Sequence, residues 1–163
     1  MARSIGLAVF VAAVALSAPR RPIAGPDGWS RAHWGMAPDE VRGEFAEAYT
    51  EDRSVVVENV LLGSISFGEA GRHRHPITAT ARFTFDRVRG LEAVRLMLND
   101  PTDEQFQALG AALRQLYGDP DFSTETSARW DFVHSVVTLA REDSGDRFPS
   151  AVWLQYQRAR YPI

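Results

Sequence analysis

The chain has 163 residues, a formal net charge of −3 and a pI near 5.8, and this length suits a single domain. Nucleic-acid-binding domains usually have a basic face and a high pI, so we expect no nucleic acid among the partners. The sequence contains no cysteine, which excludes disulfides, thiol nucleophiles, thiolate metal sites and lipid attachment through a cysteine.

Residues 1–17 have the features of a secretory signal peptide, in which a basic residue precedes an apolar run from Ile5 to Leu16. This run is too short for a helix that crosses about 30 Å of hydrocarbon, so we expect no stable membrane insertion of the mature chain. The small residues Ala15 and Ser17 predict cleavage after Ser17. Cleavage after Ala24, or retention of the leader as an anchor, are the alternatives. The predicted location is periplasmic or secreted.

Residues 18–33 are rich in proline and glycine and have no hydrophobic periodicity, which is typical of a flexible tether. Periodic hydrophobicity begins after this segment. We therefore predict a single α+β domain over residues 34–157 and a polar tail over residues 158–163.

The first predicted helix runs from Pro38 to Tyr49, because proline is well tolerated at the first helical position and Val41 and Phe45 have the spacing of a buried stripe. The apolar stretch from Val55 to Leu62 then predicts a strand. A polar loop is expected from Glu69 to Pro76.

The clearest strand is Ile77 to Asp86, where apolar and polar residues alternate strictly. This alternation predicts one face on the core and one face toward water, as in an antiparallel sheet. After a turn, the segment from Leu91 to Leu98 forms the next strand.

A second helix has the strongest boundary pattern in the chain. Thr102 and Gln105 match a capping box at its start, Gly118 suits a left-handed residue at its end, and Pro120 prevents continuation. Three more strands are predicted over residues 128–132, 136–141 and 151–156.

The predicted order is therefore helix, three strands, helix, three strands. It indicates an α+β fold in which two helices pack on one face of an antiparallel sheet. The order also suggests a possible αβββ repeat, although the two halves share no convincing sequence identity.

No catalytic or metal-binding pattern stands out. His73 and His75 supply two imidazoles, whereas zinc sites need three or four ligands, so we predict no metal and no other cofactor. Gly63 to Gly68 has serines, but not at the spacing of a nucleophile elbow. His33 and His134 are isolated in the sequence.

Arginine, tryptophan and tyrosine are common anchors of protein interfaces, and several of them occur in the last predicted strands. If they are exposed together on one sheet, they form a binding surface. The alternative is that Trp130 and Trp153 are core residues. The candidate binding residues are Arg129, Trp130, Arg141, Trp153 and Tyr156.

Two short motifs resemble a known group. Gly35-Met36 followed by Val41, and Leu116-Tyr117-Gly118-Asp119-Pro120, resemble motifs of the outer-membrane assembly lipoproteins of the SmpA/OmlA type and of the β-lactamase-inhibitor-protein-like domains. The segment around Trp34 resembles uncharacterised secreted bacterial proteins. The resemblance implies a helix-and-sheet module that binds other proteins without catalysis. This chain lacks the lipid-attachment cysteine of the lipoproteins.

The sequence thus favours an extracytoplasmic, non-catalytic domain that binds a protein, such as another envelope protein, or a cell-envelope component. The alternative is a secreted or periplasmic hydrolase with a carboxylate- or histidine-based site. A third, less favoured hypothesis is a metal-responsive protein that uses His73 and His75.

Overall fold

The structure is a computed structural model that describes residues 7–8, 25–67, 73–142 and 151–160. Most of the predicted signal peptide lies outside these residues, as do the first part of the predicted tether, the first residues of the predicted 69–76 loop and the end of the predicted tail.

The described residues form two helices and a large sheet. The elements are β1 (Leu7–Ala8), β2 (Gly28–Trp29), β3 (Ala32–His33), α1 (Pro38–Glu44), β4 (Tyr49–Glu51), β5 (Ser54–Phe67), β6 (His73–Asp86), β7 (Gly90–Leu98), α2 (Asp103–Tyr117), β8 (Phe122–Ser123), β9 (Ser127–Asp131), β10 (Ser135–Glu142) and β11 (Ala151–Arg158).

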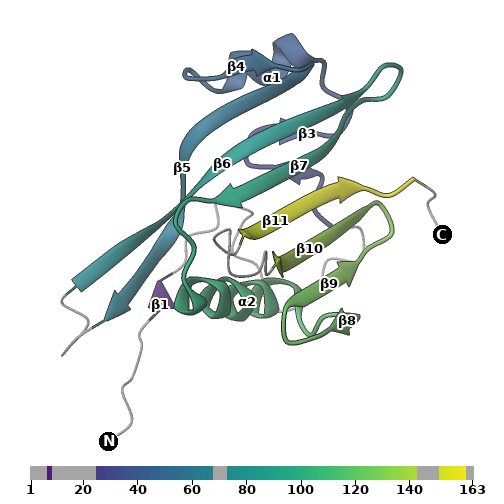
Figure 1. The fold of residues 1–163 in the computed structure, drawn as a ribbon. Coiled ribbons are helices and arrows are strands. Elements are labelled where there is room, and N and C mark those ends of the chain that lie inside the picture. The colour runs from purple at the N-terminus through teal and green to yellow at the C-terminus, as the bar shows by residue number, and fades with distance from the viewer. Residues whose placement is uncertain (1–6, 9–24, 68–72, 143–150, 161–163) are drawn as a thin grey trace, which may run out of the picture.

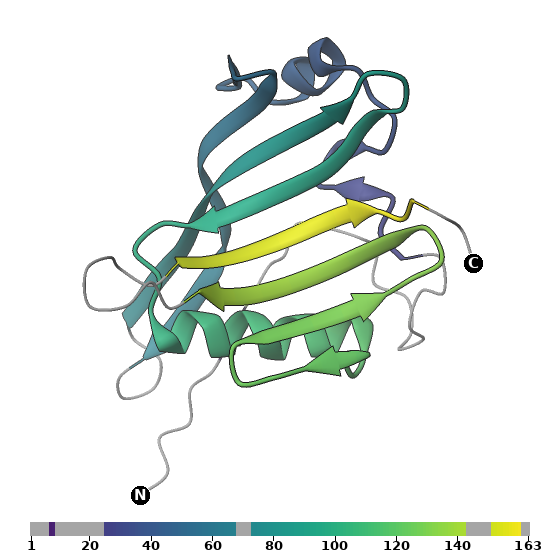
Figure 2. The ribbon, with the colours of Figure 1, turned by 45° about the vertical axis from the view of Figure 1, so that its right-hand side comes forward.

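The main sheet has nine strands, in the order β1-β5-β6-β7-β11-β10-β9-β8, with β4 also paired to β5. All of its strand pairs are antiparallel. Strands β4 to β7 form one meander, β8 to β11 form a second, and the two meet where β7 pairs with β11. The predicted α+β class with an antiparallel sheet is confirmed. Helix α1 and β4 lie at one end of the molecule, and α2 lies at the other (Figures 1 and 2).

The boundaries of α2 follow the predicted capping pattern. The Thr102 hydroxyl accepts a hydrogen bond from the Gln105 N–H at 3.2 Å, and the Gln105 side chain accepts one from the Thr102 N–H at 3.1 Å. At the other end, Gly118 has φ 78° and ψ −164°, a positive-φ backbone conformation that glycine tolerates best. Phe106, Leu109 and Leu113 of α2 are buried, whereas Leu116 in the last turn is 47% exposed.

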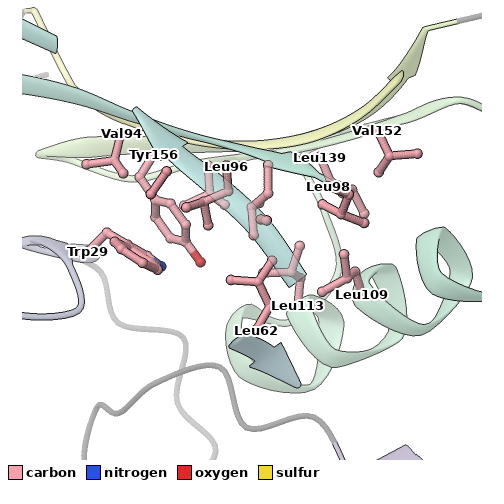
Figure 3. Close-up of a cluster of buried hydrophobic side chains, with 14 of the residues drawn as sticks. Trp29, Leu62, Val94, Leu96, Leu98, Leu109, Leu113, Leu139, Val152 and Tyr156 are labelled. Carbon is pink, nitrogen blue, oxygen red and sulfur yellow. The ribbon is translucent and has the colours of Figure 1, made fainter. Parts of the chain in front are cut away.

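The core lies between the sheet and α2. Leu109 and Leu113 project from the helix toward Leu98, Leu139 and Val152 of the sheet (Figure 3). Strand β6 contributes its predicted inward face, from Ile77 to Phe83, with alternate side chains fully buried. Burial of this apolar area is the main term that stabilises the fold.

The first helix is shorter than the predicted span from Pro38 to Tyr49. Helix α1 ends at Glu44, and Phe45 adopts an extended conformation. The Phe45 ring then packs 5.2 Å from the ring of Phe83, measured between centroids. If the helix continued, the Phe45 side chain would stay on a face of that helix. The extended conformation instead places it against the sheet. Tyr49 begins β4.

The predicted tether is wrong in its second half, because residues 25–33 are part of the folded domain. Strands β2 and β3 form a small hairpin, and Trp29 is only 6% exposed. The Trp29 ring stacks on Phe45 with centroids 6.2 Å apart. Gly25 lies so close to Phe132 that a Cβ atom at position 25 would be 2.5 Å from the Phe132 Cβ. The folded domain therefore includes residues well before position 34.

Two other predicted boundaries shift. Strand β6 begins at His73, so the part of the predicted polar loop from His73 to Pro76 is strand, and it pairs with β5. Strand β11 continues through Arg158, so Arg158, the first residue of the predicted tail, belongs to the strand. Both strands are longer than predicted because their partners extend the ladder beyond the apolar residues.

The Tyr156 hydroxyl is buried in the core (Figure 3) and has no hydrogen-bond partner among the described residues. Burial raises the pKa of Tyr156 well above its usual value of 10.0, and the neighbouring Tyr117 raises it further. Burial also raises the pKa of Tyr117. Both side chains are therefore neutral wherever the protein is folded near neutral pH.

This burial predicts a loss of stability in alkali. Above about pH 10 the unfolded chain loses its tyrosine protons while the folded chain keeps those of Tyr156 and Tyr117, so the free energy of unfolding falls as pH rises, by about 1.4 kcal/mol per pH unit for each tyrosine. Tyr156→Phe should reduce this slope in urea unfolding series, because one of the two buried tyrosines then no longer titrates. An unchanged slope in Tyr156→Phe would contradict the prediction.

Within the described residues, neither helix is long and apolar enough to cross a membrane.

Candidate functional site

The two faces of the sheet differ in character. In β11, Val152, Leu154 and Tyr156 are buried toward α2, while Trp153 and Gln155, which alternate with them, are partly exposed on the opposite face. Neither α1 nor α2 supplies a buried layer over Trp153 and Gln155. We call the face that carries these two residues the open face.

A row of polar side chains crosses the open face. Register pairs join Arg82 of β6, Arg95 of β7, Gln155 of β11, Thr138 of β10 and Arg129 of β9. Neighbouring strands in a sheet are about 4.8 Å apart, so Arg82 and Arg95 bring two like charges close together. Directly opposed like charges destabilise a sheet unless they are neutralised.

The two outer arginines of this row are neutralised. Arg82 pairs with Glu51 of β4. Arg129 pairs with Asp131 on its own strand, with Nη2 and Oδ1 2.7 Å apart. These ion pairs are exposed, so each contributes little to stability, but they cancel the charge at both ends of the row.

Arg95, at the centre, differs. Its Nε and Nη2 donate to the Gln155 side-chain oxygen at 2.8 and 2.6 Å, and its guanidinium lies 4.9 Å from the Trp153 ring centroid. No carboxylate in the described part of the chain pairs with it. Arg95 therefore has a fixed orientation and an unneutralised charge.

Trp153 is held in the same way. Its Nε1 donates to Glu142 of β10 at 3.0 Å, and its register partner on β7 is Met97, which is 36% exposed. We define the Trp153 patch as Arg95, Met97, Glu142, Trp153 and Gln155. Arginine, tryptophan and methionine are enriched in protein interfaces, and here hydrogen bonds orient the two largest of them in advance.

The five predicted binding residues do not form one surface. Trp130 is fully buried and Tyr156 is 2% exposed, both on the face toward α2. Trp130 thus agrees with the alternative interpretation as a core residue, whereas Trp153 lies on the other face. The periodicity of 2 in a strand places residues 130 and 153 on different faces once the register is known.

The predicted arginines are also separated. Arg141 lies on the α2 side, where it pairs with Asp103 and its guanidinium is 5.4 Å from the Phe106 ring centroid. Arg141 therefore joins β10 to the first turns of α2. Arg129 lies on the open face with Trp153, at the edge of the polar row.

Sequence reasoning missed Arg95, Met97 and Gln155. The alternation within residues 91–98 and 151–158 places each of them on the polar face of its strand. What the sequence does not show is that β7 and β11 are neighbours, because the two strands are far apart in the chain. That pairing puts Arg95 beside Gln155.

A second feature is a pocket of about 400 Å³ at the end of the sheet where β11 ends. The β6–β7 turn, the β9–β10 turn, the end of β11 and the amino-terminal segment line it. Its residues are Asp27, Trp34, Arg89, His134, Arg158, Ala159 and Arg160. The polar groups of the pocket are open to solvent, because His134, Arg89 and Arg160 are exposed.

A metal site is not apparent in the described part of the chain, where no three or more His, Asp or Glu side chains gather closely enough to hold an ion. His75 lies exposed on β6, two residues after His73 on the same strand. The absence of a bound metal remains the prediction, and metal binding by this pair remains the less favoured hypothesis.

Comparison of the chain with protein-family models, with curated proteins and with solved structures found no match. The resemblance to SmpA/OmlA-type lipoproteins and β-lactamase-inhibitor-protein-like domains therefore remains a prediction that is based on two short motifs.

Proposed function

We propose that this chain is an extracytoplasmic, non-catalytic domain that binds another protein of the cell envelope through the Trp153 patch. The observation that carries the proposal is the pairing of a partly exposed tryptophan with an arginine whose charge has no carboxylate partner among the described residues. Such a residue pair is typical of the energetic centre of an interface.

The charges of the open face suggest the chemistry of the partner. Arg95 offers guanidinium N–H groups, while Glu51 and Asp131 at the ends of the row are already paired with arginine. A partner that places a carboxylate on Arg95 and an apolar side chain against Trp153 and Met97 would satisfy both properties. Binding removes water from the Arg95 guanidinium, so a partner without a carboxylate at this position would leave the charge buried and unpaired. The partner's carboxylate therefore also determines specificity.

The test is affinity capture from a cell-envelope extract with the mature domain, comparing the wild type with Trp153→Ala and Arg95→Ala. Loss of a central interface anchor typically costs about 2 kcal/mol or more, or roughly 30-fold in affinity. We expect a discrete protein that the wild type retains at physiological salt and both variants lose. Each variant should unfold in urea within about 2 kcal/mol of the wild type, because both side chains are partly exposed.

Arg129→Ala is the matched control, because Arg129 lies on the same face but its charge is already paired with Asp131. It should retain the partner. Recovery of no specific protein, or equal recovery by Trp153→Ala and the wild type, would count against the Trp153 patch as the binding site.

The hydrolase hypothesis rests on one observation, the presence of His134 and Asp27 in the same pocket. Neither a serine nor a threonine lines this pocket. If His134 acts as a general acid or base, the domain should release p-nitrophenol from p-nitrophenyl acetate or p-nitrophenyl phosphate, and His134→Ala should lose this activity. That result would favour the hydrolase over a binding domain.

We further propose that the sheet consists of two copies of one unit, a helix followed by a short strand and three longer strands, which adds one short strand to the predicted αβββ order, and that both helices lie on one face. Two observations support this. Each meander follows a helix and begins with a short strand, and Val41 of α1 and Leu109 of α2 belong to one buried cluster. In such a duplication, the Trp153 patch would lie across the junction of the two copies, where β7 meets β11.

A further inference from the structure

The pocket at the end of β11 is independent of the Trp153 patch. It forms where four segments that are far apart in the sequence meet. The Ala159 N–H donates to the His134 carbonyl at 2.9 Å, and Arg158 Nη1 donates to the Arg89 carbonyl at 3.4 Å. The end of β11 is thus connected to the turns on both sides of it. A volume of about 400 Å³ is within the range of small-molecule sites.

The lining of the pocket has an excess of positive charge, since it includes three arginines and one aspartate. Arg160 is partly neutralised, because its Nε lies 3.8 Å from Glu92 Oε1. Arg158 is hydrogen-bonded to a neutral carbonyl. Within the described part of the chain, neither Arg89 nor Arg158 has an ion-pair partner at its guanidinium.

The turn that carries Arg89 is held in place. Asp86 Oδ1 accepts hydrogen bonds from the Val88 and Arg89 N–H groups at 2.8 and 2.9 Å, and these bonds lower the pKa of Asp86. The Asp86 carboxylate is therefore directed at the turn backbone, and it does not line the pocket. Arg89 is available to a ligand from a fixed backbone.

Trp34 gives the pocket a flat apolar wall. The residue is half-buried, and its Nε1 donates to the Pro26 carbonyl at 3.1 Å, which fixes the ring. Asp27 contributes to the same wall and lies near His33, with Oδ2 3.6 Å from Nδ1. The pocket thus combines guanidinium groups with an oriented aromatic ring.

We propose that this pocket binds a small organic anion whose phosphate or carboxylate lies between Arg89 and Arg158 and whose flat apolar part lies against Trp34. Arginine matches the planar oxygens of these groups with paired N–H donors. The site requires neither the Trp153 patch nor any catalytic activity.

The test is isothermal titration calorimetry of the mature domain with phenyl phosphate and with benzoate, which separates the two oxyanions. Phenol, which lacks the charge, should bind much more weakly than the better of the two. Arg89→Gln and Arg158→Gln each remove a charge-assisted hydrogen bond, so we expect about tenfold or greater weakening. Unchanged urea unfolding of these variants would show that the fold is retained.

Arg87→Gln is the matched control. Arg87 is exposed in the same turn but does not line the pocket, so its substitution changes the net charge equally and should alter affinity by less than about twofold. If Arg87→Gln weakens anion binding as much as the pocket variants do, the anions are attracted only by the general positive charge of this region. This result would overturn the proposal. Absence of binding by both anions, or phenol binding as tightly as they do, would also overturn it.

Discussion

Gly90→Ala is expected to destabilise the protein by about 3 kcal/mol or more. Gly90 has φ 71°, and a Cβ atom there would lie 2.8 Å from the Met36 carbonyl oxygen and closer still to the backbone of Gly35. The contact is close because the Leu91 N–H donates to the Met36 carbonyl at 2.8 Å, and the Gly35 N–H donates to the Leu91 carbonyl at 3.1 Å. Alanine at position 90 would therefore push Gly35 and Met36, which precede α1, away from β7.

Two other glycines separate the causes of this loss in urea unfolding. Gly118 has φ 78° and ψ −164° but open space around its Cβ position, so Gly118→Ala measures backbone strain alone, about 1–3 kcal/mol. Gly43 lies in α1 with nothing within 4 Å, and Gly43→Ala should stabilise by about 0.5–1 kcal/mol. If Gly90→Ala costs no more than Gly118→Ala, the close packing of Gly35 against Gly90 does not hold in solution.

Trp130→Ala is the second substitution with a large expected effect, a loss of about 3–5 kcal/mol. The Trp130 side chain is completely buried. Its Nε1 donates to the Gly118 carbonyl at 2.9 Å, and its ring lies 6.4 Å from that of Tyr117. Removal leaves a cavity and releases β9 from the end of α2. Since domains are stable by only about 5–15 kcal/mol, much of the total would be lost.

Trp130→Phe retains most of the ring volume and loses the hydrogen bond, so its free energy of unfolding should lie between those of the wild type and Trp130→Ala. Trp153→Ala serves as the comparison on the open face and should cost clearly less. Similar losses for Trp130→Ala and Trp153→Ala would mean that the two tryptophans are not divided between a buried face and an exposed face.

Patterns within a few residues of sequence predict the ends of α2 and the buried face of β6. Thr102, Gln105 and Gly118 determine the ends of α2 through hydrogen bonds within a few residues. The alternation in residues 77–86 determines which face of β6 is buried. Both features depend on interactions that lie close in the sequence, so the sequence alone was sufficient.

Long-range packing determined what the sequence did not show. Helix α1 ends before Phe45 because that ring packs on Phe83, and the segment at Trp29 is folded because it stacks on Phe45. The candidate surface depends in the same way on the pairing of β7 with β11. No local pattern indicates that Arg95 lies beside Gln155, and none assigns the five predicted binding residues to one face of the sheet.

The pairing of β7 with β11 also has a kinetic consequence. Within each meander, paired strands follow one another along the chain, whereas Arg95 and Gln155 are separated by 60 residues. Closing so long a segment has a larger entropy cost than forming a hairpin, and non-local contacts slow folding. The two half-sheets can therefore form early, and their joining along Leu96 and Leu154 is the step expected to set the folding rate of the whole domain.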